Sequence, residues 1–427
     1  MTTTKSFEKT VLQNGLRVVT APMPAAKSVA CFLMLAAGSR YETRETNGIA
    51  HFAEHMFFKG TEKRPTARHI AGEIDSIGGE FNAFTGKEYT GYYVKCAAEH
   101  RDVALDVLVD MIRHSKFEPD EIEREKGVIV EEMNMYFDTP RDYVDGVYDS
   151  LLYGDQPLGW DIIGTKETVR AAKRETFLDY LGLWYRAPRM VAGVAGDVGA
   201  DVLARLEELL GDVRDGSTGA PDPVAWKQDS ARVKLHTKAS DQAHLRIGVH
   251  SYPLDNPDRY PLTLLATVLG GGMSSRLFTE VRERRGLAYY IYGHNMGYTD
   301  AGTLYAQGGV DIGRIDDAVR TIVGEFERMA RDPVEPEELE KARNFAKGRL
   351  VLSLEDPKGN IIFALRDEVL ESRIREPDEV LAGLDSVTRE DIQRVAQDII
   401  REDRLNLAII GPFDDAERFE KLLAFDS

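Results

Sequence analysis

Hydrophobic and polar positions follow the same order twice along the chain. Each half opens with two segments that predict strands, because apolar and polar residues alternate or, around Val29–Ala36, an apolar run fits a buried strand. In the first half these segments are Leu16–Ala21 and Val29–Ala36, and in the second they are Arg232–His236 and His244–His250. A helical pattern follows each pair of strands. The repeated order indicates two copies of one supersecondary unit.

Long amphipathic helices follow in both halves, and each half contains a later strand and ends on another. Strands and helices in this mixture favour an α+β fold that occurs twice: two homologous α/β domains, each with a mixed or antiparallel sheet packed by helices. The predicted strands are Tyr89–Ala97, Met190–Gly196, Thr303–Gly309 and Leu405–Gly411, and the predicted helices are Val103–Arg113, Asp120–Phe137, Arg314–Met329 and Pro336–Glu355.

A composition shift near the midpoint marks the division between the halves. Asp212–Ser230 is rich in Gly, Pro, Asp and Ser, which is typical of a linker. We therefore predict a first domain at residues 1–213, a linker at 214–230 and a second domain at 231–427. A chain of 427 residues is long enough for two such domains.

The charge balance narrows the range of partners. There are 72 acidic against 54 basic residues, a net charge of -18, so the surface repels nucleic acid and anionic membranes. The acidic excess favours solubility and could also attract cationic peptides. No run approaches the roughly 20 apolar residues of a membrane span, and the first residues lack an apolar signal core. We expect a cytoplasmic protein with no membrane partner.

Only two cysteines occur, Cys31 and Cys96, and both lie in apolar alternating stretches. We interpret them as small core residues rather than as a disulfide. Two thiols are also too few for a zinc site built on cysteine.

Histidine supplies the candidate chemistry. His51 and His55 lie four residues apart on a predicted helix that Asn47 could cap, so both project from one face as two ligands of one metal require. Glu54 stands beside His55 in an apolar setting, where a carboxylate can take a proton from a water at the metal. Two histidines at this spacing also occur by chance on ordinary helices, so the pattern alone leaves that alternative open.

A third ligand is predicted on the helix Asp120–Phe137. Glu125 and Glu132 share a stripe with Val128 and Ile129 that we expect to be buried, whereas Glu131 falls on a solvated stripe. A buried carboxylate needs a partner, and a metal is a natural one for Glu132. Glu125, two turns earlier, could support a ligand histidine. A helix face with ordinary salt bridges is the alternative.

At these residues the chain resembles the pitrilysin-like peptidases, also called inverzincins, whose motif His-x-x-Glu-His reverses the common His-Glu-x-x-His order. His51-Phe52-Ala53-Glu54-His55 matches this motif. Glu132 matches the family's distant third ligand, and Glu125 matches a further family glutamate seven residues earlier. The resemblance implies one Zn²⁺ per chain, held by His51, His55 and Glu132, with Glu54 as the catalytic base.

Two further segments carry the resemblance. Gly78–Thr85 is similar to the family's edge strand, which implies that Phe81, Asn82 and Ala83 contact the substrate backbone. The segment from Arg282 to Tyr289 is similar to the family's Arg/Tyr substrate-binding segment; without the family, a surface arginine and a core tyrosine would be the simpler interpretation.

The length is similar to that of short members that resemble the catalytic subunit of mitochondrial processing peptidase. Such members pair two homologous chains into a clamshell, which implies a homodimer or a heterodimer here, each chain forming half of the clamshell. We therefore expect a zinc metalloendopeptidase that hydrolyses peptides or unfolded segments inside a closing chamber. A non-catalytic partner or scaffold subunit, and a structural metal-binding protein, are the alternatives.

Overall fold

The computed structural model describes residues 5–216 and 219–425. Residues 1–4, 217–218 and 426–427, which fall within the predicted first domain, linker and second domain, lie outside the described residues. The chain forms two compact units, and each is described separately. Unit 1 comprises residues 1–134, 161–222 and 351–377; unit 2 comprises residues 135–160, 223–350 and 378–427.

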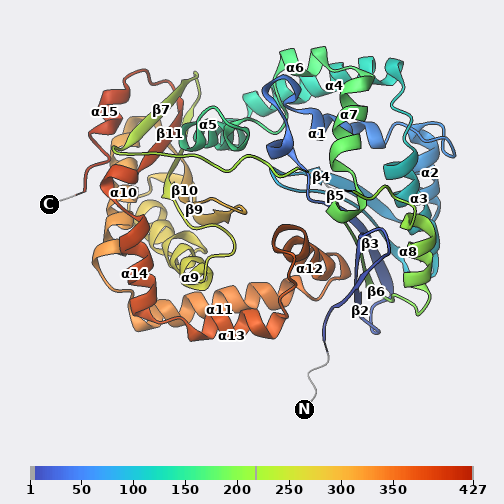
Figure 1. Cartoon of the computed structure of the whole chain (residues 1–427). Coiled ribbons are helices and arrows are strands. Elements are labelled where there is room, and N and C mark those ends of the chain that lie inside the picture. Colours follow the sequence, from blue (N-terminus) through green and yellow to red (C-terminus); the bar gives the residue numbers. More distant parts are fainter. Residues whose placement is uncertain (1–4, 217–218, 426–427) are drawn as a thin grey trace. The chain divides into compact units, whose positions relative to one another are not determined.

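Unit 1 is built on a six-stranded mixed sheet (Figure 1). All neighbouring strands are antiparallel except β2 and β6, which are parallel. β4 has only β5 as a neighbour and therefore forms one edge of the sheet. In sheet order the strands are β1 (Glu8–Val11), β2 (Arg17–Pro22), β6 (Met190–Gly196), β3 (Ser28–Leu35), β5 (Thr90–Ala97) and β4 (Glu80–Thr85).

Unit 2 repeats this plan with a five-stranded mixed sheet. β7 and β11 are parallel, and the other neighbours are antiparallel, as in the five corresponding strands of unit 1. The order of strands along the chain and across the sheet is thus the same in both units, apart from the additional β1. In sheet order the strands are β7 (Arg232–Thr237), β11 (Asn406–Gly411), β8 (Gln242–His250), β10 (Gly302–Asp311) and β9 (Ala288–Gly297).

Helices cover these sheets, and their apolar stripes supply the core. The helices of unit 1 are α1 (Ile49–Phe57), α2 (Ala67–Ser76), α3 (Arg101–His114), α4 (Pro119–Asp138), α6 (Lys166–Ala171), α7 (Arg174–Trp184), α8 (Val202–Leu210) and α12 (Pro357–Glu371). The last four residues of α4 belong to unit 2. The helices of unit 2 are α5 (Pro140–Tyr153), α9 (Arg259–Gly270), α10 (Ile315–Arg331), α11 (Pro336–Ser353), α13 (Pro377–Ser386), α14 (Arg389–Ile399) and α15 (Ala416–Glu420). The last three residues of α11 and the first residue of α13 belong to unit 1.

Two helices do not belong to the unit that surrounds them in sequence. The strands of one sheet all come from residues 8–196 and those of the other from residues 232–411. However, α12 packs on β2, β6 and β3 of unit 1, whereas α5 packs on β7, β11 and β8 of unit 2. The compact units therefore differ from the contiguous ranges 1–213, 214–230 and 231–427, because an apolar stripe fixes which face of a helix is buried and not which sheet buries it.

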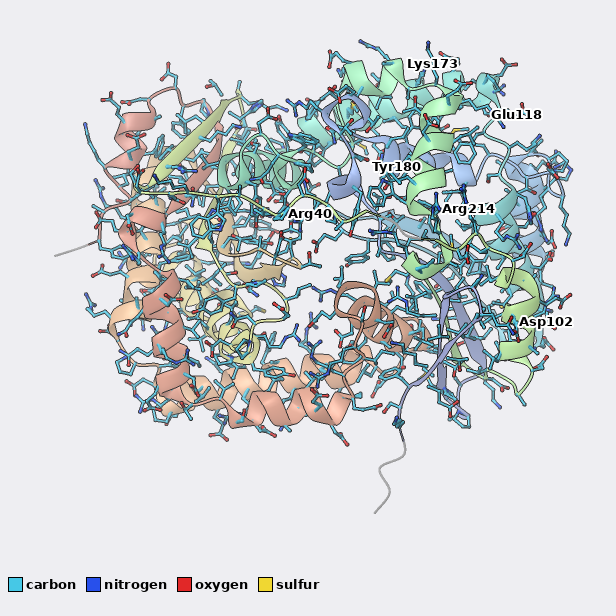
Figure 2. All side chains as sticks on the ribbon, in the orientation of Figure 1. Arg40, Asp102, Glu118, Lys173, Tyr180 and Arg214 are labelled. Atoms are coloured by element: carbon cyan, nitrogen blue, oxygen red, sulfur yellow. The ribbon has the colours of Figure 1, made fainter. Side chains whose placement is uncertain are left out.

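Polar ties hold the loops of unit 1 beside the sheet. The Tyr180 hydroxyl of α7 donates a hydrogen bond to the Gly38 carbonyl at 3.2 Å, and the buried Arg40 guanidinium donates to Glu88 at 2.6 Å. Arg40 and Tyr180 are labelled in Figure 2. These bonds satisfy polar groups that would otherwise be costly to bury.

The predicted architecture is confirmed: two α/β units with mixed sheets, with predicted strands and helices displaced by a few residues at most. The cysteines are also as predicted, since Cys31 and Cys96 are buried and free. The burial predicted for one stripe of α4 is wrong at two positions, because Glu132 is half-buried, with 34% of its side chain exposed, and Val128 lies in solvent. Val128 is 51% exposed, although Glu125 and Ile129 on the same predicted stripe are buried. In the described residues, no helix is both long and apolar enough to cross a membrane.

Candidate metal centre

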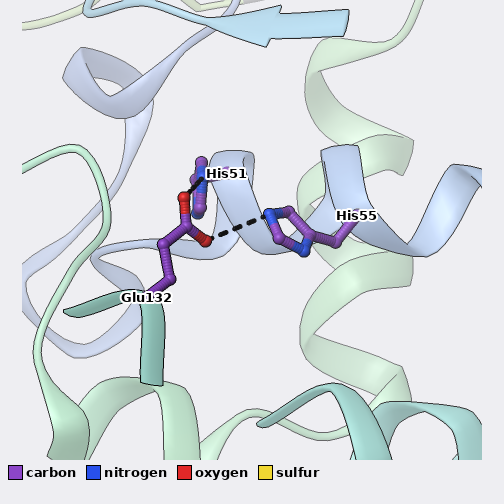
Figure 3. A group of neighbouring side chains, drawn as sticks. All are labelled: His51, His55 and Glu132. Carbon is purple, nitrogen blue, oxygen red and sulfur yellow. Dashed lines mark ion pairs between the residues drawn. The ribbon is translucent and has the colours of Figure 1, made fainter. Parts of the chain in front are cut away.

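Three potential ligands converge within unit 1. The Glu132 carboxylate lies between two imidazole rings, with one oxygen directed to each (Figure 3). His55 Nε2 lies 3.4 Å from Glu132 Oε2, and His51 Nε2 lies 3.7 Å from Glu132 Oε1. One ligand atom from each residue lies within 4.8 Å of the others. The helix spacing and the distant glutamate thus meet at one point, as the sequence indicates.

Helix α1 presents the two histidines because its other face is apolar. Phe52, Ala53 and Met56 are buried, which leaves the histidine face half-buried toward α4. Ring centroids of His51 and His55 lie 4.7 Å apart, one helical turn from each other. The four-residue spacing within one helix therefore sets the relative position of His51 and His55.

The start of α1 differs from the prediction. The residue preceding the helix is Gly48, with φ at +94°, and the Asn47 side chain does not cap it. Instead the buried Glu42 carboxylate accepts hydrogen bonds from Gly48 N at 2.8 Å, Ala50 N at 2.7 Å and Asn47 Nδ2 at 3.0 Å. Gly48 is required because a Cβ would meet the Ile163 carbonyl oxygen at 2.7 Å.

The side chain of Glu125 orients one ligand. Its Oε1 lies 2.8 Å from His55 Nδ1, and its Oε2 lies 2.5 Å from Lys59 Nζ. Holding Nδ1 in this way leaves Nε2 of His55 directed at Glu132, the arrangement in which a carboxylate supports a metal-ligating imidazole. His51 has no such support among the described residues, since its buried Nδ1 has no hydrogen-bond partner.

The two histidines differ in basicity. Burial, together with the neighbouring His55, lowers the pKa of His51 to about 4. Burial also opposes protonation of His55, but hydrogen bonds to Glu125 and Glu132 outweigh it and raise the pKa of His55 to about 9. The hydrogen bond with His55 in turn lowers the pKa of Glu132. The Glu132 carboxylate thus lies beside the neutral imidazole of His51 and stabilises the proton on His55. The same negative charge suits a divalent cation in place of that proton.

The donor set fits zinc. Two imidazole nitrogens and one carboxylate oxygen are the ligands of a catalytic zinc site, with the fourth position left open. Metal–ligand bonds of about 2.0 Å in tetrahedral geometry place neighbouring ligand atoms roughly 3.3 Å apart. The two distances from Glu132 to the imidazoles, 3.4 and 3.7 Å, are close to this value.

Glu54 lies beside the ligands on α1. Its only hydrogen-bond partner among the described residues is Thr85, whose hydroxyl donates to Glu54 Oε2 at 2.6 Å. Burial raises the pKa of the Glu54 carboxyl, although Thr85 and His55 oppose the rise. A carboxyl whose pKa is moved toward neutrality is suited to exchanging protons.

The edge strand β4 runs beside α1. Phe81 packs its ring 5.5 Å from that of Phe58, the residue that follows α1. Asn82 is exposed, and its Oδ1 accepts a hydrogen bond from Ala83 N at 2.8 Å. The edge position of this segment matches the expectation from sequence, and an unpaired strand edge can bind an extended chain.

Arg282 and Tyr289 lie in unit 2. Arg282 belongs to the π-helical segment η6 (Phe278–Arg284), and Tyr289 is the second residue of β9. The Arg282 guanidinium carbon lies 5.6 Å from the Tyr289 ring centre. Tyr289 is 75% exposed, so the alternative of a core tyrosine is wrong. The two side chains are neighbours on the surface of unit 2.

Three contributors were not predicted as site residues: Glu42, Lys59 and Thr85. Each acts through a hydrogen bond or ion pair made by folding. Thr85 gave a weak signal as the end of the predicted edge segment, and Lys59 as a cation one turn beyond His55. Glu42 gave none, because its hydrogen bonds to the start of α1 form only in the folded chain.

Comparison with known proteins identifies the family of this chain. Residues 17–166 match the family model described as Insulinase (Peptidase family M16), and residues 171–345 match the one described as Peptidase M16 inactive domain. The chain belongs to peptidase family M16. The M16 match that is not described as inactive contains His51, Glu54, His55 and Glu132.

The M16 relatives are similar over nearly their whole length. The chain is 38% identical over 402 residues to the "Uncharacterized zinc protease YmxG" of Bacillus subtilis, covering 94% of this chain and 97% of that protein. It is 35% identical over 414 residues to an "Uncharacterized zinc protease" of Rickettsia felis, covering 96% and 98%. A crystal structure of a protease from Helicobacter pylori shares the fold, with a TM-score of 0.88, 22% identity and coverage of 96% and 100%.

Proposed function

We propose that this chain is a zinc metalloendopeptidase that hydrolyses peptide bonds in extended peptides or unfolded segments. The observation that carries the proposal is the convergence of His51, His55 and Glu132, with Glu54 beside them on the same helix. The relatives named as zinc proteases support the choice of metal and reaction. Enclosure of the substrate in a closing chamber is carried over from the family resemblance.

The site residues divide the work between binding metal and moving protons. One zinc ion held by His51, His55 and Glu132 would polarise the scissile carbonyl and acidify the attacking water. Glu54 takes a proton from that water and passes it to the leaving amine. Glu125 holds His55 in the orientation that binding requires.

Substrate binding is assigned to the edge strand β4 and to a pair of side chains in unit 2, the half-buried Arg282 and the exposed Tyr289. A peptide adds to β4 as a further strand, beside Phe81, Asn82 and Ala83, so that backbone hydrogen bonds give affinity with little dependence on sequence. Arg282 and Tyr289 carry donors that can bind substrate carbonyl groups, and the exposure of Tyr289 supports this role.

Replacing the proposed base tests the reaction. Glu54→Gln removes the proton acceptor with little change in volume, so we expect one bound zinc and a fall in kcat of about 100-fold or more. Turnover of quenched peptides and zinc content by elemental analysis are the measurements. Undiminished cleavage by Glu54→Gln would contradict the proposed mechanism.

A matched pair on α4 tests the metal assignment in the same assays. Glu132→Gln removes the proposed ligand, whereas Glu131→Gln changes the exposed neighbour. We expect zinc and activity to be lost only in Glu132→Gln. A wild-type chain that binds zinc but cleaves no member of a peptide library would instead be a structural metal protein, and one that binds no zinc would be a non-catalytic partner subunit.

Assembly and location stay predictions. Pairing into a homodimer, or into a heterodimer with a homologous chain, follows from the resemblance and is measured by light scattering of the purified protein, alone and with candidate partners. A cytoplasmic location and the lack of nucleic-acid or membrane binding follow from the sequence and are checked by fractionation and binding assays.

A further inference from the structure

The proposed base has one hydrogen-bond partner, and that partner belongs to the edge strand. Thr85 is the last residue of β4, and its hydroxyl donates to Glu54 Oε2 at 2.6 Å. No other hydrogen bond restrains the Glu54 carboxylate among the described residues. The orientation of this carboxylate therefore depends on a residue of the strand beside α1.

The bond leaves the second carboxylate oxygen for proton transfer. A carboxylate has two oxygens that accept hydrogen bonds, and the hydroxyl of Thr85 is directed to one of them. Glu54 would otherwise rotate about its side-chain bonds, and ordering such a side chain costs conformational entropy. Fixing it in advance reduces the entropy lost when the reacting groups align.

Thr85 lies on the strand proposed to bind the peptide and contacts the residue proposed to act as base. Asn82 lies three residues earlier on the same strand, where a peptide would add to the sheet. Thr85 is also held in register, opposite Thr90 of β5. A strand fixed in this way sets the distance between the backbone of a bound peptide and the carboxylate that serves as base.

We propose that Thr85 is a positioning residue that holds the Glu54 carboxylate in register with a peptide bound along β4. The inference rests on the proposed peptidase function. A purely structural tie between α1 and β4 is the simpler role, but the two elements are also in contact elsewhere, and Phe58, which follows α1, packs against Phe81 of β4. Loss of one partly exposed hydroxyl therefore leaves their packing in place.

Two substitutions separate these roles. Thr85→Val keeps the shape of the side chain and removes the donor, whereas Thr85→Ser keeps the donor. We expect Thr85→Val to retain one zinc and the wild-type melting temperature, while kcat on a quenched peptide falls about 10-fold or more and KM changes less than about twofold. That fall is part of the roughly 10²- to 10⁴-fold contribution of a general base. Thr85→Ser should keep kcat within about threefold of wild type.

The outcomes are distinguishable from failure of the proposed function. If the wild-type chain cleaves peptides and Glu54→Gln does not, an unchanged kcat in Thr85→Val overturns the role of Thr85 alone. Loss of zinc or of folding in Thr85→Val, with no recovery in Thr85→Ser, also overturns it and indicates a structural role. If the zinc-loaded wild-type chain cleaves no peptide, both the function and this inference fail.

Discussion

At the scale of single residues, the buried carboxylate of Glu42 holds the first turn of the helix that carries the proposed ligands. Three N–H groups donate to it, and two of them are backbone groups at the start of α1. The first N–H groups of a helix have no partner within the helix, so an external acceptor is required. Burial raises the pKa of Glu42 to about 8, against the effect of these three donors.

Truncating Glu42 should loosen the site. Glu42→Ala leaves Gly48 N and Ala50 N buried without an acceptor, so we expect a loss of about 1–3 kcal/mol in the free energy of unfolding and weaker zinc binding. Urea denaturation and zinc titration measure the two effects. Glu45→Ala, at an exposed position nearby, should leave both unchanged. Equal stability and zinc affinity in Glu42→Ala would show that the helix starts without this carboxylate.

At the scale of elements, α12 packs on the sheet of unit 1 at a glycine of β6. β6 is buried along its whole length, and Gly193 sits at its centre. A Cβ there would meet Leu365 Cδ1 at 2.6 Å and Ile361 Cγ1 at 2.7 Å, both on α12. Glycine allows the helix to approach the strand closely, because a larger residue would have to displace it.

Enlarging Gly193 should therefore separate helix and strand. We expect Gly193→Val to lower the free energy of unfolding by about 1–3 kcal/mol, as overpacking of a core does. The same change at Gly182, an exposed position of α7 with nothing within 4 Å of its added Cβ, serves as the control. Chemical denaturation measures both variants. A harmless Gly193→Val would mean that α12 can shift on the sheet without cost.

At the scale of the whole molecule, the two units share one arrangement of strands but carry different side chains on it. Both units have the same order and direction of five strands, yet the ligand cluster belongs to unit 1. In unit 2 the buried His250 of β8 stacks on Trp226 with ring centroids 4.0 Å apart, and the Tyr153 ring lies 5.7 Å away. Burial and the charges of Arg232 and Arg404 lower the pKa of His250 to about 4.

This lowered pKa predicts an acid-sensitive stability. As the pH falls, His250 is protonated near pH 6.5 in the unfolded chain but only near pH 4 in the folded chain. The stability linked to His250 is therefore present above pH 6.5 and is lost as the pH falls toward 4, by up to about 1.4 kcal/mol per pH unit.

His250→Phe tests this linkage, since it keeps an aromatic ring against Trp226 and removes the titrating group. Because other groups titrate in the same range, the measurement is the difference between wild type and variant. Urea unfolding followed by tryptophan fluorescence from pH 7 to pH 4.5 should show a smaller loss of stability in the variant. Parallel curves for the two proteins would exclude a contribution from His250.

The sequence by itself determined the local relations of this protein. Alternation located the strands, and helical spacing put His51, Glu54 and His55 on one short helix. The stripe on α4 indicated Glu132 and Glu125. Side-chain direction within one element depends on backbone geometry alone, so the strands and the shared helix of His51, Glu54 and His55 are as predicted.

Only the tertiary structure decided what each element meets. Glu42 and Thr85 reach the site across loops and strands, and the sheets that bury α5 and α12 could not be read from their apolar stripes. The wrong prediction for Val128 has the same cause: a helical stripe is wider than the surface that a neighbour covers. Contacts between distant segments depend on the packing of the whole unit. The periodicity of the sequence does not indicate which segments come into contact.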